Sequence, residues 1–292
     1  MTGKNFRGTG VALVTPFDQQ GQVDIDALKK LVDKVIAEGV NYLVALGTTA
    51  ETPTLDAQET ETVLDAILAH NGGRVPVVCG IGGNHTAEVI ARIQKFQSKK
   101  IDAILSVAPY YNKPTQEGLF QHFKSIADST TLPVILYNVP GRTSSNILPS
   151  TVLRLAESCS NIVAIKEASG NLLQNMEIVR SKPADFVVLS GDDALVLPQM
   201  AAGIEGVISV AANCFTHDFS QMVNFALNGD YENARALHYR LLPAIDLLFE
   251  EGNPVGVKMV LHLQNICRPD LRLPLVKASE SLTEKLKAYL AS

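Results

Sequence analysis

Short runs of apolar, largely β-branched residues recur along the chain, separated by stretches of helical periodicity. The runs predict eight strands, near residues 10–14, 42–46, 75–79, 103–107, 134–137, 162–165, 186–189 and 206–210. The stretches between them predict helices at roughly 26–38, 56–70, 85–98, 116–129, 149–157, 171–181 and 193–202. Gly39 stands where the first helix should end, and Asp56 and Asn171 stand where later helices should begin.

Strands that alternate with helices predict a parallel sheet, and eight of them favour a closed (β/α)8 TIM barrel over an open, doubly wound sheet. The strands are continuous apolar runs, as expected when both faces of a sheet are covered. The dinucleotide-binding alternative lacks its fingerprint, because His85 replaces the last glycine of the run that begins at Gly80. We therefore predict a catalytic barrel over residues 1–224 and a C-terminal helical domain over 225–292, with helices near 232–249, 254–265 and 279–290.

Composition narrows the function classes. The 292 residues carry a formal net charge of −5, which argues against a nucleic-acid partner. No apolar run is long enough to cross a membrane, and the run 11–14 is too short for a signal peptide. The four cysteines form no CxxC and are expected to be reduced, which predicts a cytoplasmic protein. The six histidines show no metal-ligand spacing, so we expect no metal.

Active sites of barrels lie in the loops at the carboxyl ends of the strands. Polar and functional residues follow the predicted strands at these points: Thr48, Thr49, Tyr110, Tyr111, Tyr137, Arg142, Lys166, Gly191 and Ile208. The sequence thus concentrates its candidate chemistry at one end of the predicted barrel.

Lys166 is the most informative of these residues, because it ends the apolar strand 162–165. Burial lowers the pKa of an ammonium toward a nucleophilic amine, which is what Schiff-base chemistry on a carbonyl substrate needs. The alternative is a lysine that extends to water or pairs with Glu167. Lys258 also lies in an apolar stretch, but we expect it to reach water from its helix near the C-terminus.

The neighbouring candidates allow two interpretations each. Tyr137 is either a core aromatic or a proton shuttle beside the lysine. Thr48 and Thr49 are either turn residues or the binding site of a small carboxylate. Arg142 is either a surface ion-pair partner or a bidentate ligand for a substrate carboxylate.

Five motifs of the chain together resemble the dihydrodipicolinate synthase family, also called the 4-hydroxy-tetrahydrodipicolinate synthase family. The resemblance runs over nearly the whole chain and rests on residues 47–51, 108–114, 137–143, 165–168 and 190–193. Each motif is moderately specific, and five in order with matching spacing are highly specific.

The resemblance implies a mechanism without metal or organic cofactor. Lys166 would form an imine with pyruvate, and Tyr137, Thr48 and Tyr111 would relay protons. In the family, the tyrosine matching Tyr111 reaches into the neighbouring subunit, which implies a homotetramer built as a dimer of dimers.

The resemblance also assigns the binding residues. Thr49 and the main chain at Ile208 would hold the pyruvate carboxylate, with Gly191 also lining the substrate site. Arg142 would bind L-aspartate 4-semialdehyde, the second substrate. The product would enter lysine and diaminopimelate synthesis.

One position departs from the family, which usually has glycine in place of Ala50. Alanine is costly there if the position requires positive φ, and nearly neutral if it is helical.

Two other functions remain open from the sequence. N-acetylneuraminate lyase and the 2-keto-3-deoxy sugar-acid aldolases share the lysine and tyrosine, although Arg142 favours the semialdehyde. A non-catalytic barrel that binds a keto acid is the alternative from another class, and intact Lys166, Tyr137 and Arg142 argue against it.

Regulation by lysine is a further expectation from the resemblance. Relatives bind lysine at the dimer interface, at positions matching Asn84, Glu88 and Tyr110. The family's lysine-sensitive members often have histidine where this chain has Ala57 and Thr60. We therefore expect lysine to bind and to inhibit only weakly.

Overall fold

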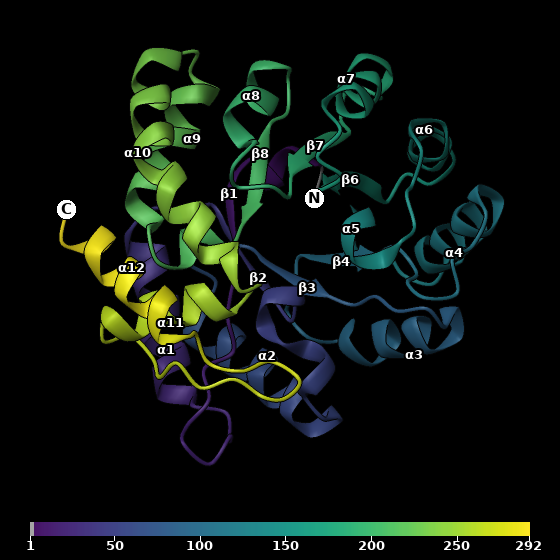
Figure 1. The fold of residues 1–292 in the computed structure, drawn as a ribbon. Coiled ribbons are helices and arrows are strands. Elements are labelled where there is room, and N and C mark those ends of the chain that lie inside the picture. The colour runs from purple at the N-terminus through teal and green to yellow at the C-terminus, as the bar shows by residue number, and fades with distance from the viewer. Residues whose placement is uncertain (1–2) are drawn as a thin grey trace. The chain divides into compact units, whose positions relative to one another are not determined.

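The computed structural model describes residues 3–292 and contains eight parallel strands that form a closed barrel, each strand next to its neighbours in the chain (Figure 1). The strands are β1 (Gly8–Ala12), β2 (Tyr42–Ala45), β3 (Val77–Gly80), β4 (Ala103–Val107), β5 (Val134–Asn138), β6 (Ile162–Glu167), β7 (Val187–Ser190) and β8 (Gly206–Ser209). The predicted barrel class is confirmed, and every predicted strand overlaps an observed one. Nearly all strand residues are buried, which explains their continuous apolar runs.

The chain divides into two compact units. The first unit comprises Met1–Gly8 and Pro76–Ile208, and the second comprises Thr9–Val75 and Ser209–Ser292. These units are groups of residues that pack closely together, and they do not test the expected domains. The boundary between a barrel at 1–224 and a helical domain at 225–292 stays a prediction.

The first unit contains strands β3 to β7 with helices between them. These helices are α3 (Thr86–Phe96), α4 (Gln116–Asp128), α5 (Pro140–Thr143), α6 (Pro149–Ser158), α7 (Leu172–Ser181) and α8 (Val196–Ala201). Helices α4, α6 and α7 pack one after another beside the strands (Figure 1). Asn171 caps α7 by accepting a hydrogen bond from the Gln174 N–H at 3.1 Å, as the sequence predicts.

The second unit contains β2, most of β1 and the long helices of both chain ends. These are α1 (Ile25–Ala37), α2 (Ala57–Asn71), α9 (Thr216–Leu227), α10 (Tyr231–Glu250), α11 (Val255–Leu263) and α12 (Glu280–Leu290). Helix α10 packs along α9 and against α11 and α12 (Figure 1). Asp56 and Glu59 form a capping box at the start of α2.

Two helices were not anticipated from the sequence. The short α5 contains Pro140 and Gly141, which normally indicate a turn, and only four residues are helical. Helix α9 follows β8 and completes the alternation of strands and helices. No helix within residues 3–292 combines the length and the apolar character that a membrane span requires.

Candidate active site

Lys166 lies on β6 with its side chain largely buried; only 6% of the residue is exposed. It is in register with Tyr137 on β5, and its Nζ lies 4.2 Å from the centroid of the Tyr137 ring. Within residues 3–292 no carboxylate forms an ion pair with this ammonium. A buried lysine without a counter-ion lies against a buried tyrosine, which is an arrangement suited to carbonyl chemistry.

Glu167 follows Lys166 but does not pair with it. Successive residues of a strand point to opposite faces, so the carboxylate lies on the other side of β6. It accepts hydrogen bonds from Gln174 Nε2 at 2.8 Å, from Asn138 Nδ2 at 3.0 Å and from the Ser169 N–H at 3.0 Å. Burial raises the pKa of Glu167, and these hydrogen bonds oppose that rise. The sequence alternative in which Glu167 neutralises Lys166 is therefore wrong.

Asn138 connects this polar cluster to the loop that carries Arg142. Its Nδ2 donates to Asn146 Oδ1 at 2.8 Å, and its Oδ1 accepts from the Ile147 N–H at 3.0 Å. Asn146 in turn donates to Gln174 Oε1 at 2.9 Å. The sequence does not predict this cluster: polar residues at two strand ends are visible in it, but their contact with each other and with Gln174 depends on tertiary packing. The cluster fixes the backbone that follows Tyr137 and the backbone that follows Lys166.

Gly191 follows β7 and makes room for the lysine. A Cβ atom on this residue would lie 2.8 Å from Lys166 Cε and 2.7 Å from Ala168 Cβ, closer than carbon atoms pack. Glycine is required here because the Lys166 and Ala168 side chains lie too close to leave room for a Cβ atom. Gly191 therefore lies beside Lys166, and its expected role in lining the substrate site stays a prediction.

Arg142 lies on α5 with an exposed side chain. No carboxylate pairs with it in the part of the chain that the structure describes. Thr143 stabilises the turn, because its hydroxyl donates to Val139 O at 3.1 Å or to Ser145 O at 2.9 Å. The surface ion pair considered from the sequence does not form, and the guanidinium is left available for an anionic ligand.

Ile208 lies on β8 with 1% of its surface exposed. Its side chain belongs to the core, so only its main chain is suited to bind a ligand. The main-chain role that the family resemblance assigns to it stays a prediction.

Thr48 and Thr49 lie in the second unit, in a 3-10 turn over Thr48–Ala50 that follows β2. Thr48 is exposed, and Thr49 is 2% exposed with its Oγ1 accepting from Asn253 Nδ2 at 2.9 Å. Ala50 is part of the turn, and the left-handed residue is Glu51, at φ 54°. The substitution of the usual glycine by Ala50 is therefore nearly neutral for the backbone.

Lys258 differs from its sequence-based expectation. It is fully buried on α11, with Nζ 2.5 Å from Glu51 Oε1. The prediction that it reaches water is wrong, because a carboxylate 207 positions earlier in the chain meets it inside the second unit. Periodicity on one helix gives no information about such a distant partner.

Tyr110, Tyr111 and Asn84 lie together in the first unit. Tyr111 is 89% exposed with φ 68°, and Tyr110 is 44% exposed. Asn84 Nδ2 donates to Tyr110 O at 3.4 Å, while the exposed Glu88 lies one turn into α3 and contacts His85 at 3.7 Å. The structure places Asn84 beside Tyr110, and it leaves the Tyr111 ring projecting into solvent in the single chain.

The family model of the dihydrodipicolinate synthetase family matches residues 5–292. The chain is 51% identical over 284 residues to 4-hydroxy-tetrahydrodipicolinate synthase of Flavobacterium psychrophilum, and the match covers 97% of each chain. The match therefore extends over both the barrel strands and the C-terminal helices.

Solved structures give the same result. Dihydrodipicolinate synthase from Acinetobacter baumannii, a chloride-inhibited enzyme solved with pyruvate, superimposes with a TM-score of 0.95 at 40% identity, covering 98% of both chains. DHDPS from Cyanidioschyzon merolae, solved with lysine bound, gives a TM-score of 0.94 at 37% identity and covers 98% of both chains.

Proposed function

Because the chain belongs to the dihydrodipicolinate synthetase family, we propose that it condenses pyruvate with L-aspartate 4-semialdehyde. The product is 4-hydroxy-tetrahydrodipicolinate, at the entry to lysine and diaminopimelate synthesis. The observation that carries the proposal is the buried Lys166, which has no carboxylate partner within residues 3–292 and lies against Tyr137.

The proposed chemistry proceeds through an imine on Lys166. The amine adds to the ketone carbon of pyruvate, and water leaves as the C=N bond forms. Loss of a proton from the pyruvate methyl group gives an enamine, whose carbon bonds to the aldehyde carbon of the semialdehyde. The protonated imine accepts the electron pair at the deprotonation step, and the aldehyde oxygen takes up a proton to become a hydroxyl group. The amino group of the semialdehyde then adds to the imine carbon, which closes the ring and releases the Lys166 amine. These steps use no metal or organic cofactor.

Proton transfer is assigned to three hydroxyl groups. Tyr137 is the proposed acid and base at the imine nitrogen, supported by its contact with Lys166. Thr48 is proposed to link Tyr137 to Tyr111 in this relay. The exposure of Thr48 and Tyr111 in the single chain is consistent with a relay that is completed by a second subunit.

The substrate carboxylates are assigned to other residues. We propose that the Thr49 hydroxyl and the main chain at Ile208 bind the pyruvate carboxylate, with Gly191 lining the same site. Arg142 is proposed to bind the semialdehyde carboxylate, since its guanidinium has no protein partner in the described chain.

We propose a cytoplasmic homotetramer, a dimer of dimers, as the working assembly. An exposed fraction of 89% is unusual for a tyrosine, and the positive φ of Tyr111 directs the chain away from the usual backbone conformation. A second copy of the chain is the proposed partner of this side chain.

The sugar-acid lyases are the remaining enzymatic alternative. Their substrates carry a polyol chain that needs several hydroxyl partners, whereas Arg142 offers a planar charged group. The curated relative at 51% identity supports the semialdehyde. Steady-state assays with L-aspartate 4-semialdehyde and with N-acetylneuraminate compare the two directly. Turnover of neither substrate would favour a barrel that only binds a keto acid.

We also propose that lysine binds weakly at Asn84, Glu88 and Tyr110. The lysine-bound structure of a relative supports a lysine site in the family. Thr60 is a poor substitute for an imidazole, because its hydroxyl already donates to Asp56 O at 2.7 Å. Titration of lysine into the activity assay is expected to show weak inhibition; strong inhibition at micromolar lysine contradicts this part of the proposal.

The decisive experiment traps the imine. Borohydride added in the presence of pyruvate should inactivate the enzyme and add the mass of one reduced pyruvate adduct to Lys166 alone. Peptide mass spectrometry locates the label. A label on Lys258 or another lysine, with Lys166 unmodified, would contradict the mechanism.

A further inference from the structure

Glu51 lies at the point where the turn carrying Thr48 and Thr49 ends. It is buried, with 1% of its side chain exposed, and its φ of 54° is unusual for a residue other than glycine. Its N–H donates to Thr48 O at 3.1 Å, which closes the turn. A movement of Glu51 would therefore move the two threonines.

Two distant segments hold the Glu51 carboxylate. Lys258 on α11 lies 2.5 Å from Oε1, and the Arg272 N–H donates to Oε2 at 3.2 Å. Lys258 also donates to Asp270 O at 2.9 Å and lies over the Phe17 ring, 4.2 Å from its centroid. Burial lowers the pKa of Lys258, and the nearby Glu51 carboxylate opposes this change. Paired and hydrogen-bonded, the two charges fix the end of the turn to α11.

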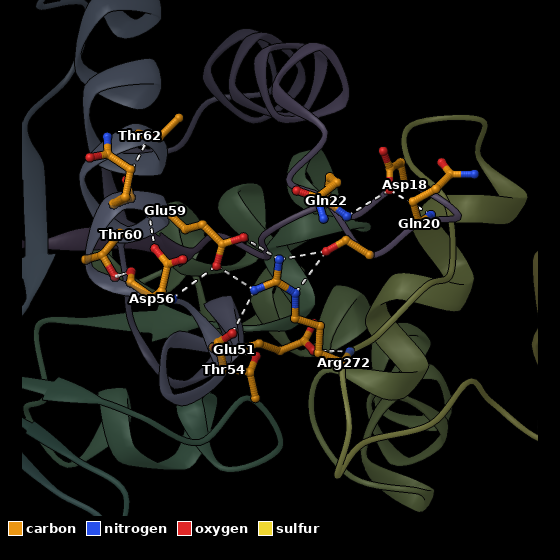
Figure 2. A network of polar contacts seen from close by, with 12 residues as sticks. Asp18, Gln20, Gln22, Glu51, Thr54, Asp56, Glu59, Thr60, Thr62 and Arg272 are labelled. Carbon is orange, nitrogen blue, oxygen red and sulfur yellow. Dashed lines mark hydrogen bonds and ion pairs between the residues drawn. The ribbon is translucent and has the colours of Figure 1, made fainter.

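Arg272 holds the next part of the same segment. Figure 2 shows its guanidinium beside Glu59 and Thr54. The guanidinium donates to Gly21 O at 2.6 Å and to Thr54 O at 2.7 Å. Its Nη1 lies 2.6 Å from Glu59 Oε2, at the start of α2. The C-terminal region of the chain thus fixes residues 51–59 at both ends.

Asn253 lies two residues before α11 and contacts the turn that carries Thr49. Its Nδ2 donates to Thr49 Oγ1 at 2.9 Å, and both residues are at least nine-tenths buried. A hydroxyl has one proton and two lone pairs. Because Thr49 accepts from Asn253, its own proton is free to be donated to an anionic oxygen.

We propose that Asn253 and the Glu51–Lys258 ion pair are positioning residues for Thr49. Asn253 sets the direction in which the Thr49 hydroxyl donates, and the ion pair holds the turn in place. The inference rests on the proposed function, in which Thr49 binds the carboxylate of pyruvate. It assigns to the C-terminal helices a part in substrate affinity as well as in the packing of the second unit.

The test compares two substitutions at position 253. Asn253→Ala removes one hydrogen bond and should raise the KM for pyruvate about tenfold. Asn253→Asp keeps the shape but places an acceptor and a negative charge at Thr49, so its effect should be larger. The KM for the semialdehyde should change much less in both variants. Asn71→Ala is the matched control, because Asn71 is also buried in the second unit, and its side chain bonds to the main chain of Val75, at 2.8 Å and 3.3 Å, and not to Thr49. Its pyruvate KM should stay at the wild-type value.

A double-mutant cycle separates positioning from general loss of structure. In a Thr49→Val background, Asn253→Ala should cause no further rise in the pyruvate KM, since the group it orients is gone. Independent, multiplicative effects in the cycle, or an unchanged KM in folded Asn253→Asp, overturn the inference. The isosteric aspartate keeps the test available if the alanine variant does not fold.

The ion pair is tested with the neutral double variant Glu51→Gln/Lys258→Met, which leaves no unpaired charge. It should raise the pyruvate KM with little change for the semialdehyde; an unchanged pyruvate KM in the folded double variant contradicts the role of the pair. Borohydride trapping on the wild-type enzyme separates a failure of the proposed function from a failure of the positioning role proposed for Asn253 and the ion pair. Absence of label on Lys166 refutes the proposed function, whereas normal labelling with unaffected Asn253 variants refutes only this inference.

Discussion

Two buried lysines of this chain have opposite environments. Lys166 lies on β6 against an aromatic ring, without a carboxylate partner in the described residues, and Lys258 lies on α11 against the Glu51 carboxylate. Both are at least nine-tenths buried. Desolvation costs the same kind of energy at each position, but only Lys258 recovers part of it through an ion pair. The comparison indicates that burial alone does not distinguish the two lysines, whereas the presence or absence of a carboxylate partner does, and it is the lysine without one that we propose as the nucleophile.

The largest expected effect is the loss of activity in Lys166→Met. Removal of the nucleophile should lower kcat by roughly 10⁴-fold or more, as for other covalent catalysts. Thermal stability should stay the same or rise, because no partner loses its charge. The assay uses both substrates at saturation, followed by a thermal melt. If Lys166→Met lost stability as well as activity, Lys166 would also hold the structure together, and it would not differ from Lys258 in this respect.

Lys258→Met should have the complementary effect. It leaves Glu51 buried and unpaired, which typically costs about 3–5 kcal/mol of unfolding free energy. Urea unfolding of the variant and the wild type measures the difference. The double variant Glu51→Leu/Lys258→Met should recover most of the loss, since apolar replacement of a buried pair is often neutral. Full stability in the single variant would mean that water reaches Glu51.

Gly191→Ala sharpens the comparison at Lys166. The added methyl group overlaps Lys166 Cε and Ala168 Cβ, so the amine should be displaced. A shift of about 1 Å typically slows a positioned reaction by 10- to 100-fold. The rate of imine formation with pyruvate, followed by borohydride quenching, measures this step. Ala168→Gly in the same background should restore part of the rate, and a normal rate without it would show that Lys166 moves freely.

His122 extends the comparison to a buried base without a charged partner within residues 3–292. Burial lowers the pKa of His122 to about 4, from 6.5. Between these values the unfolded chain binds a proton that the folded chain does not, so stability falls as the pH drops below 6.5. At pH 5 the lowered pKa of His122 reduces the unfolding free energy by at most about 2 kcal/mol.

Urea unfolding at pH 7.5 and at pH 5 measures how much unfolding free energy is lost on acidification. This loss should be smaller in His122→Gln than in the wild type. Glutamine keeps a polar partner for the Thr86 hydroxyl, which lies 2.8 Å from His122 Nδ1. Identical pH dependence in both proteins would show that His122 is protonated in the folded state.

The polar clusters show where sequence-based prediction fails. Asn138 and Glu167 directly follow Tyr137 and Lys166, yet nothing in their spacing predicts that they bond to each other. Their partner Gln174 comes from the first turn of α7, and its contact depends on how the helix packs on the strand. The Ala50 position shows the same limit, because its helical conformation depends on a turn whose left-handed residue is Glu51.

By itself, the sequence determined most of the helices and strands and the candidate reactive residues. Strand and helix periodicity is local, so eight strands and most helices follow from neighbouring residues, and a lysine at the end of an apolar strand is visible without knowledge of the fold. Tertiary structure alone decided which buried groups meet. Asn253 and Thr49 are 204 positions apart, and Lys258 meets Glu51 across a similar separation. Such contacts arise from packing between distant segments, and only they distinguish the buried lysine that pairs with a carboxylate from the one that has no such partner in the described residues.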